Sequence, residues 1–327
     1  MLDVFFSPTK RLFAPFLLGA LLLATIVWFR HWRGRAPLWK WLFPRRIWLH
    51  PSSLLDLRLA LFRTALQGLF VAPFAIPVAG AALALARLLW AHVGLVPDTI
   101  GLSRGVVTAL FSVTAFCAED LGRYMVHRLA HEVGPLWELH KVHHSAEVMT
   151  PLTVYRTHPL ESVLMRAGAA GSITLVGAFF IWIFPGRVGA WEISGVYALS
   201  FLWTAAGANL RHSHVWLPYP SWLERLLISP AQHQLHHAVD PRLHHTNFGS
   251  ALAIWDLLGG TLRLSGRRPR LVFGLPEAQQ NHARTVRSAL WHPLVCAARR
   301  LGALRRVRGG SVSRDATTRK GCDPGGP

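Results

Sequence analysis

The stretch HRLAHEVGPLWELHKVHH, residues 127–144, holds five histidines in 18 positions, spaced HxxxH and then HxxHH. The HxxHH spacing returns in HQLHH, residues 233–237. On a helix, side chains at positions i, i+3 and i+4 share one face, so each helical group is predicted to turn its imidazoles toward one point. The groups are His127 and His131; His140, His143 and His144; His212 and His214; and His233, His236 and His237.

This number of imidazoles indicates metal binding. A structural zinc site takes four ligands, usually including cysteine, whereas these groups offer eight or more nitrogen donors. They match the needs of two metal ions about 3.5–4 Å apart. Imidazole binds Zn, Cu, Fe and Ni alike, so spacing alone does not name the metal. Other histidines are expected to be solvated or hydrogen-bonded (His31, His50, His92, His282 and His292) or to lie in a loop (His244 and His245).

The composition is that of a membrane protein. Of the 327 residues, 51% are hydrophobic and 16% are charged, against about 25% charged residues in soluble domains. Apolar runs lie at residues 12–29, 59–95, 106–117, 163–184 and 191–210. We therefore predict an all-α integral membrane protein, with about four to five spanning helices and a helical cap that carries the histidines.

The net charge of +19 is concentrated beside the apolar runs. One basic block covers residues 30–46 and a second covers residues 263–320, which matches the positive-inside rule. No basic–aromatic single-strand motif accompanies the charge, so we expect no nucleic-acid partner. If residues 59–95 cross the membrane once, all histidine groups lie on the cytoplasmic face. A re-entrant pair at 59–95 would instead place the histidine groups on the face opposite to the first basic block.

The chain is predicted to divide into three segments. Residues 1–104 form N-terminal spans and a basic cytoplasmic loop, residues 105–280 form the histidine-bearing domain, and residues 281–327 form a basic segment that is disordered from about 309. The three cysteines contain no CxxC pair, so the sequence predicts neither a disulfide framework nor a thiolate zinc site.

The sequence segments around the histidines resemble those of the fatty acid hydroxylase / sterol desaturase superfamily of integral-membrane di-iron enzymes. DLGRYMVHRLAH (residues 120–131) is similar to its first box, LWELHKVHHS (136–145) to its second, and YRTHPLE (155–161) to the segment that follows. SPAQHQLHH (229–237) and NFGSALAIWDLLGGTL (247–262) are similar to the last box and the words after it.

This resemblance covers about residues 105–280, and it implies a di-iron catalytic domain there. One departure is Gly259, which stands where relatives usually have phenylalanine. We expect this change to alter local packing and to leave the chemistry unchanged.

The resemblance implies two non-heme irons that use O2 to attack a C–H bond of a sterol-like, fatty acyl or related lipid, with hydroxylation favoured over desaturation. No heme, flavin or iron–sulfur motif is apparent, so we expect a separate electron-transfer protein (ferredoxin, cytochrome or reductase). The implied iron ligands are His127, His131, His140, His143, His144, His212, His233, His236 and His237.

Further residues are candidates for supporting roles. His158 and His214 are candidates for ligands or for residues that orient ligands, although many relatives have asparagine at the place of His214. Carboxylates commonly orient metal-bound imidazoles, and Tyr124 is a candidate for the substrate pocket. The carboxylate candidates are Asp120, Glu132, Glu161, Asp240 and Asp256.

Two other functions remain as alternatives. A membrane zinc or other metal hydrolase would work without O2. A non-enzymatic metal-binding or transport protein would need polar ligands within its spans. The histidines lie at the ends of the apolar runs or beyond them, which counts against transport.

Overall fold

The computed structural model describes residues 3–70, 77–96, 101–193, 196–276, 279, 282–308 and 322, and most of this chain is helical. The predicted all-helical class is confirmed apart from one minimal antiparallel hairpin. The first elements are α1 (Asp3–Phe6), α2 (Ala14–His31), α3 (Leu38–Leu42), α4 (Arg45–Trp48), α5 (Pro51–Phe70), α6 (Val78–His92), α7 (Arg104–Glu132) and α8 (Gly134–His144). They are followed by η2 (Pro151–Tyr155), α9 (Pro159–Ile183), β1 (Glu192–Ile193), β2 (Val196–Tyr197), α10 (Ala198–Ala205), η3 (Ala208–His212), α11 (Pro230–His236), α12 (Pro241–His244), α13 (Ile254–Gly259) and α14 (Val286–Arg308).

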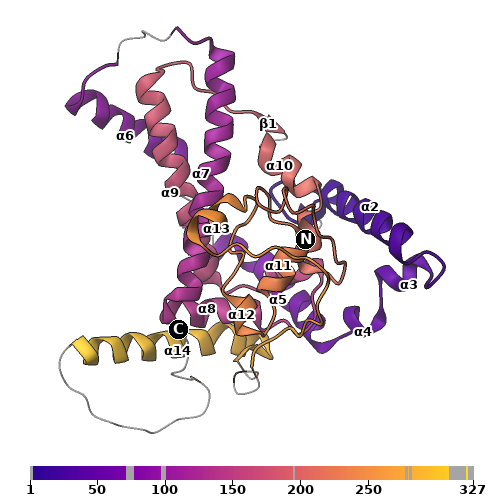
Figure 1. Ribbon diagram of the computed structural model, residues 1–327. Helices are drawn as coiled ribbons and strands as arrows, with labels where there is room; N and C mark the ends of the chain where they lie inside the picture. The colour runs from indigo at the N-terminus through magenta and orange to yellow at the C-terminus, as the bar shows by residue number, and fades with distance from the viewer. Residues whose placement is uncertain are drawn as a thin grey trace.

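Three described helices are long and apolar enough to cross a membrane, namely α2, α7 and α9. Helix α6 is also apolar but has only 15 residues. Figure 1 shows α6, α7 and α9 extending together from the rest of the molecule, whereas α2 lies apart from them. The prediction of an integral membrane protein is thus supported, with three candidate spans in the described chain in place of the four to five expected.

Two of the predicted apolar runs take other forms. Residues 191–210 do not form a span, because they contain the hairpin, the eight-residue helix α10 and the short 3-10 helix η3. Between α10 and η3, Gly207 has a φ of 92°, a left-handed conformation that favours glycine and ends the helix. Residues 59–95 divide between α5 and α6, and residues 71–76 lie outside the described chain.

The packing of α7 against α9 depends on two glycines that face each other. A Cβ placed on Gly122 would lie 2.3 Å from the carbonyl oxygen of Gly168, and a Cβ on Gly168 would lie 2.8 Å from the carbonyl oxygen of Gly122. The two backbones therefore touch, as small residues permit where membrane helices cross. This crossing holds the histidine-bearing end of α7 near the beginning of α9.

The short helices form a cap around the C-terminal end of α7 (Figure 1). Arg156, which is 2% exposed, lies within this cap. Its guanidinium pairs with Asp56 of α5 at 2.9 Å and donates to the Ser52 and Ser145 hydroxyls and the Val142 carbonyl. Removing one partner of a buried ion pair is costly, because the other charge is left uncompensated. Arg156 thereby fastens α5 to α8.

Helix α14 packs on α8 and is joined to it by a buried carboxylate. Glu138 accepts from Lys141 at 2.9 Å and from Arg300 at 2.7 Å. Cys296 of α14 forms a disulfide with Cys322. The prediction from cysteine spacing is therefore wrong on this point, because the bridge joins residues that no short motif connects. The predicted disorder from about 309 falls outside the described residues, Cys322 excepted.

Replacing Gly168 with leucine is expected to disturb the α7–α9 crossing, because the new side chain would meet backbone atoms of α7. We expect a loss of about 1–3 kcal/mol in the free energy of unfolding, the usual cost of overpacking, measured as a lower Tm in detergent. Gly171→Leu on the same helix is the matched control, since nothing lies within 4 Å of a Cβ there. Equal losses in the two variants would contradict the role of the crossing.

Candidate metal centre

Four elements bring the histidines together. Helix α7 carries the HxxxH pair near its end, α8 carries the first HxxHH, η3 ends at His212, and α11 with the next residue carries the second HxxHH. Local chemistry sets the start of α11. The Ser229 hydroxyl accepts from the Gln232 N–H, and the Gln232 side chain accepts from the Ser229 N–H. This capping box, with Pro230 at the first helical position, is a typical helix start.

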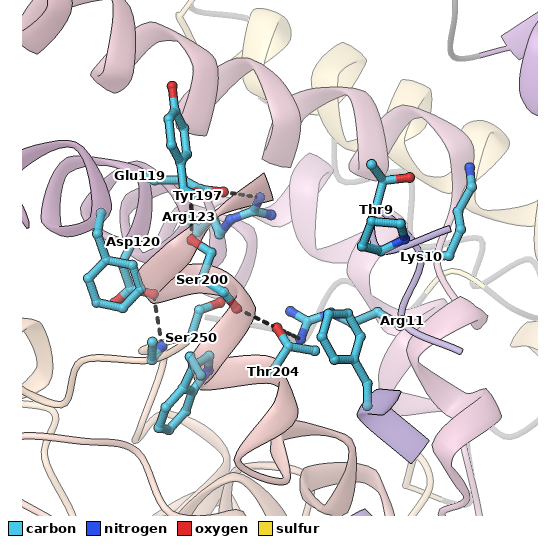
Figure 2. Close-up of a pocket in the computed structure, with 15 residues that line it drawn as sticks. Thr9, Lys10, Arg11, Glu119, Asp120, Arg123, Tyr197, Ser200, Thr204 and Ser250 are labelled. Atoms are coloured by element: carbon cyan, nitrogen blue, oxygen red, sulfur yellow. Dashed lines mark hydrogen bonds and ion pairs between the residues drawn. The ribbon is translucent and has the colours of Figure 1, made fainter. Parts of the chain in front are cut away.

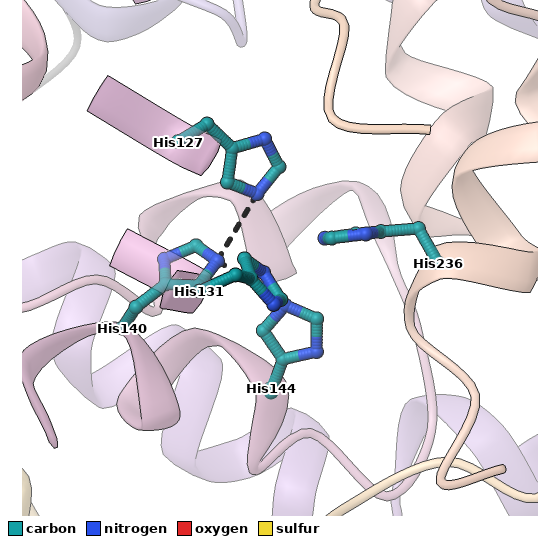
Figure 3. A group of neighbouring side chains, drawn as sticks. All are labelled: His127, His131, His140, His144 and His236. Carbon is teal, nitrogen blue, oxygen red and sulfur yellow. Dashed lines mark hydrogen bonds between the residues drawn. The ribbon is translucent and has the colours of Figure 1, made fainter. Parts of the chain in front are cut away.

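The nine predicted ligands form two groups, and within each group the candidate ligand atoms lie within 4.8 Å of one another. All nine residues are buried. Figure 3 shows the first group, whose rings come from α7, α8 and α11 and face a common centre. The first group is His127, His131, His140, His144 and His236, and the second is His143, His212, His233 and His237.

Acceptors outside the groups decide which ring nitrogen carries the proton. Nδ1 of His127 lies 2.7 Å from the carbonyl oxygen of Phe248, and Nδ1 of His140 lies 2.7 Å from a carboxylate oxygen of Glu161. A carbonyl oxygen only accepts, so Nδ1 of His127 donates and its Nε2 is left with a lone pair. The same holds for His140 when Glu161 is ionised, and burial raises the pKa of Glu161 to about 7. The two Nε2 atoms nevertheless lie 3.1 Å apart. Facing lone pairs repel each other, and a cation bound by both removes that repulsion.

The same arrangement recurs in both groups. Nδ1 of His236 donates to the carbonyl of Thr246 at 2.9 Å, and Nδ1 of His143 donates to the carbonyl of Arg156 at 3.3 Å. In the second group, four pairs of Nε2 atoms lie 2.9–3.2 Å apart. Nitrogen ligands about 2.1 Å from one ion lie roughly 3.0–3.4 Å from each other. The spacing is therefore that of ligands around a metal ion.

Burial keeps the imidazoles neutral, which is the form that binds metal. It lowers the pKa of His140 and of His143 to about 3. Several buried ring nitrogens also lack a hydrogen-bond partner among the described residues, and leaving a buried polar atom unpaired costs about 1–3 kcal/mol. These atoms are Nδ1 and Nε2 of His131, Nδ1 of His144, Nδ1 of His233 and Nε2 of His236. Such donor sets fit iron, and equally zinc, copper or nickel.

Two of the predicted carboxylates orient ligand histidines. Glu161, on the first turn of α9, accepts directly from His140. Asp256 acts through the backbone: it accepts from the N–H groups of Phe248 and Gly249 at 2.8 and 2.7 Å. It therefore fixes the peptide whose carbonyl accepts from His127. Outer hydrogen bonds of this kind set the tautomer and the direction of a ligand ring.

The other three carboxylates do not contact the ligand rings. Asp120 accepts from the N–H groups of Ala251 and Leu252 at 2.8 and 2.9 Å, and so fastens the loop after the last box to α7. Glu132 and Asp240 form ion pairs with neighbouring arginines. None of these three carboxylates belongs to a group of candidate ligands among the described residues.

The structure places His158, His214 and Tyr124 outside both groups. His158 caps the start of α9, and His214 donates to the carbonyl of Trp41 at 2.8 Å. Tyr124 lines neither of the cavities beside α7. Its hydroxyl instead fills the space at Gly259, where a Cβ would lie 2.1 Å from it. The absence of the phenylalanine common in relatives thus has a packing reason.

Sequence patterns did not single out His244, Arg156 or Asp56. His244 was expected in a loop but ends the one-turn helix α12, and its ring centroid lies 4.6 Å from that of His144. Arg156 matters through its carbonyl, which orients His143, and Asp56 holds Arg156 in place. No spacing rule reveals these roles, because each partner comes from a distant segment.

A smaller cluster lies beneath α14 and consists of His282, His292 and Cys296. The two histidine Nδ1 atoms lie 2.9 Å apart, so both residues are hydrogen-bonded, as expected. Cys296 is at the same time the partner of Cys322 in the disulfide.

A cavity of about 490 Å³ reaches the metal-binding groups. Five of the candidate ligands form part of its wall, together with segments of α5, α7, α9 and the chain before α2. Its size lies within the range of about 300–1,000 Å³ that is common for small-molecule sites. The ligand nitrogens can therefore be reached by a bound molecule of moderate size.

Comparisons with known proteins agree with this geometry. Residues 112–261 match the fatty acid hydroxylase family. This confirms the predicted resemblance for the part of the chain that carries all nine histidines. No solved structure gives a significant match.

Three relatives illustrate the range of this resemblance. Alkylglycerol monooxygenase of Homo sapiens is 29% identical over 162 residues, which are 50% of this chain and 32% of that protein. Ornithine lipid hydroxylase of Rhizobium tropici is 30% identical over 145 residues, 43% of this chain and 38% of that protein. Delta(7)-sterol 5(6)-desaturase of Aspergillus fumigatus is 26% identical over 140 residues, 38% of this chain and 41% of that protein. The chain thus spans well under half the length of each relative.

The variant Glu161→Gln is expected to weaken metal binding about 10–100-fold, the usual effect of losing a partner that orients a ligand. The amide is a poorer acceptor for the Nδ1–H of His140 than the carboxylate is. Competition with a chelator, followed by metal analysis of the purified protein, measures the change. Glu132→Gln is the control, because Glu132 pairs with Arg128 outside the ligand groups. Unchanged affinity in Glu161→Gln would remove Glu161 from the centre.

Proposed function

We propose that this protein is a membrane-bound non-heme di-iron oxygenase that uses O2 to hydroxylate a C–H bond of a lipid. The observation that carries the proposal is the pair of buried histidine groups, in which ring nitrogens face one another at ligand spacing and acceptors outside the groups orient rings in both of them. The match to fatty acid hydroxylases and the apolar helices α2, α7 and α9 support a lipid substrate.

The proposal assigns one iron to each group. The groups adjoin, because the rings of His144 and His237, one from each group, stack with centroids 4.5 Å apart. Two-metal sites commonly have ions about 3.5–4 Å apart. The bound irons would supply the oxidising power of O2 that an unactivated C–H bond requires.

The chain's own residues position and shield the reacting groups. Glu161 and the carbonyls of Phe248, Thr246 and Arg156 keep the ligand rings oriented. The cap buries the rings, and the cavity gives a lipid access to them. Hydroxylation is favoured over desaturation because two of the three relatives described above are named as a monooxygenase and a hydroxylase. Dehydrogenation of the same carbon chain is the second outcome.

Two proposals concern the surroundings of the centre. Electrons for O2 reduction would come from a separate ferredoxin, cytochrome or reductase. The histidine groups would face the cytoplasm, as the basic residues of α3, α4 and α14 favour by the positive-inside rule.

A metal hydrolase and a metal-binding or transport protein remain the alternatives. Transport requires ligands along the spans, whereas the ligand histidines lie at the end of α7 and in the cap. Hydrolysis does not consume O2, so oxygen dependence separates it from the proposal.

The decisive experiment is metal analysis and turnover of the detergent-purified protein, reconstituted with iron under anaerobic conditions. We expect about two irons per chain and a hydroxylated lipid whose new oxygen derives from 18O2. The label is read by mass spectrometry of lipids extracted from the reaction mixture. Product formation without O2, or one tightly bound zinc in place of iron, would overturn the proposal.

His236→Ala and His143→Ala remove one donor from each group, so each is expected to lower iron content and to reduce product more than about 100-fold. His214→Ala is the matched control, because His214 bonds to Trp41 outside both groups. Membrane insertion of all three variants is checked by fractionation. Normal product levels in His236→Ala or His143→Ala would contradict the ligand assignment.

A further inference from the structure

The wall of the cavity beside the histidine groups carries far more positive than negative charge. Among its described lining residues, Glu161 is the only carboxylate, and it already accepts from His140. The cations are Lys10, Arg11, Arg63, Arg123, Arg166 and Arg211. They come from the chain before α2 and from α5, α7, α9 and η3, so folding has gathered them from five separate segments.

Two of these arginines donate hydrogen bonds to neutral groups of the described residues around the cavity. Arg11 donates to the Thr204 hydroxyl at 3.3 Å. Arg211 is 6% exposed and donates to the carbonyls of Ala208 and Ser250. Such bonds orient a guanidinium but do not neutralise its charge. Figure 2 shows Arg11 beside Thr204 in the adjoining cavity, which shares the segment around Arg11 with the cavity at the histidines.

The other three arginines also contribute more positive charge than the nearby carboxylates offset. Arg123 forms an ion pair with Glu119 at 2.7 Å (Figure 2). Arg63 of α5 donates to the hydroxyl of Thr157, which is neutral. Arg166 lies on α9 and faces the same space. Glu119 therefore pairs with Arg123. The wall has one further carboxylate, Glu161, for its other arginines, which are Arg11, Arg63, Arg166 and Arg211.

Arg211 is buried and Arg11 is half-buried, so part of this positive charge is removed from water. Burial and the charge of Arg123 lower the pKa of Arg11 to about 10, while the carboxylate of Glu119 raises it by a smaller amount. Arg11 therefore still carries its proton near pH 7. Buried charges in proteins are normally paired, and guanidinium groups pair with phosphate or carboxylate in a two-pronged geometry. The excess cations thus call for an anionic ligand.

We propose that this cavity binds the anionic headgroup of the lipid substrate, a phosphate or carboxylate, against the arginine wall. The reaction in this inference rests on the proposed function. The choice of an anionic ligand rests on the charge of the cavity wall. Phe62 and Met165 add apolar surface to the lining. Leu61 of α5 and Leu160 and Leu164 of α9 are exposed, and they lie close in sequence to lining residues of the cavity. The proposal places the exit of the acyl chain toward the bilayer along these leucines.

The arrangement also limits which carbon reacts. The arginines and five ligand histidines line one cavity of about 490 Å³, in the lower half of the common range for ligand sites. A headgroup held by the arginines therefore places atoms only a few bonds away beside the histidines. The oxidised carbon is then expected in the headgroup or in the adjoining part of the chain.

The test compares two lipids with identical short acyl chains, phosphatidic acid and diacylglycerol. Their affinities for the full-length protein are measured in neutral detergent by isothermal titration calorimetry at about 0.15 M salt, which screens distant surface charge. The protein keeps its bound metal, and no electron donor is added, so binding is measured without turnover. We expect phosphatidic acid to bind at least about tenfold tighter, as an ionic hydrogen-bonded contact provides. Inorganic phosphate alone should compete weakly, because it lacks the acyl chain.

Arg63→Gln and Arg166→Gln should each reduce the ratio of the two affinities about threefold or more, and Arg63→Lys should restore part of it. Arg58→Gln is the matched control, because Arg58 is exposed on the same helix as Arg63 and is not among the lining residues. Unchanged diacylglycerol affinity shows that the variants remain folded. Equal affinities of the wild-type protein for the two lipids, full competition by phosphate, or an equal loss in Arg58→Gln would overturn the headgroup site.

Failure of this inference and failure of the proposed function are distinguishable. Selective binding of phosphatidic acid by a protein without oxygenase activity supports the headgroup site and contradicts only the reaction. Oxygen-dependent hydroxylation of neutral lipids, with no preference for an anionic headgroup, supports the reaction and overturns the site.

Discussion

The structure depends on imidazole lone pairs that are held facing one another inside the protein. Nδ1 of His127, His140, His143 and His236 is committed to an oxygen acceptor, so the Nε2 side of each ring has no proton to offer. Neutral rings in this arrangement repel one another, and burial removes the water that would solvate them. Bound metal ions, as proposed, would resolve this conflict and would explain why so many histidines are buried together.

The acceptors tie this centre to the rest of the fold. The carbonyl that orients His143 belongs to Arg156, whose guanidinium is paired with Asp56 of α5. Glu161 lies on the first turn of α9. This helix is held against α7 by the contact of Gly122 and Gly168. The packing of apolar helices therefore determines where a carboxylate meets His140. A change at the helix crossing is expected to reach the centre through this carboxylate.

The same packing shapes the cavity beside the centre. Helices α5 and α9 contribute both cavity-lining arginines and exposed leucines, so the polar and apolar ends of the proposed lipid substrate would have separate places to lie. The neutral imidazoles bring no negative charge that would pair with the arginines, and bound metal ions would add to the positive charge. The proposed anionic ligand would offset both.

The sequence by itself determined the helical class, the membrane setting and the nine histidines that meet, because helical periodicity and apolar length act over short stretches. It did not determine that residues 191–210 lack a span, or that the histidines divide into five and four. The cationic wall and the roles of Arg156, Asp56 and His244 were also decided only by the tertiary structure. The physical reason is that each of these features joins segments far apart in the chain, and their meeting depends on packing that no local spacing encodes.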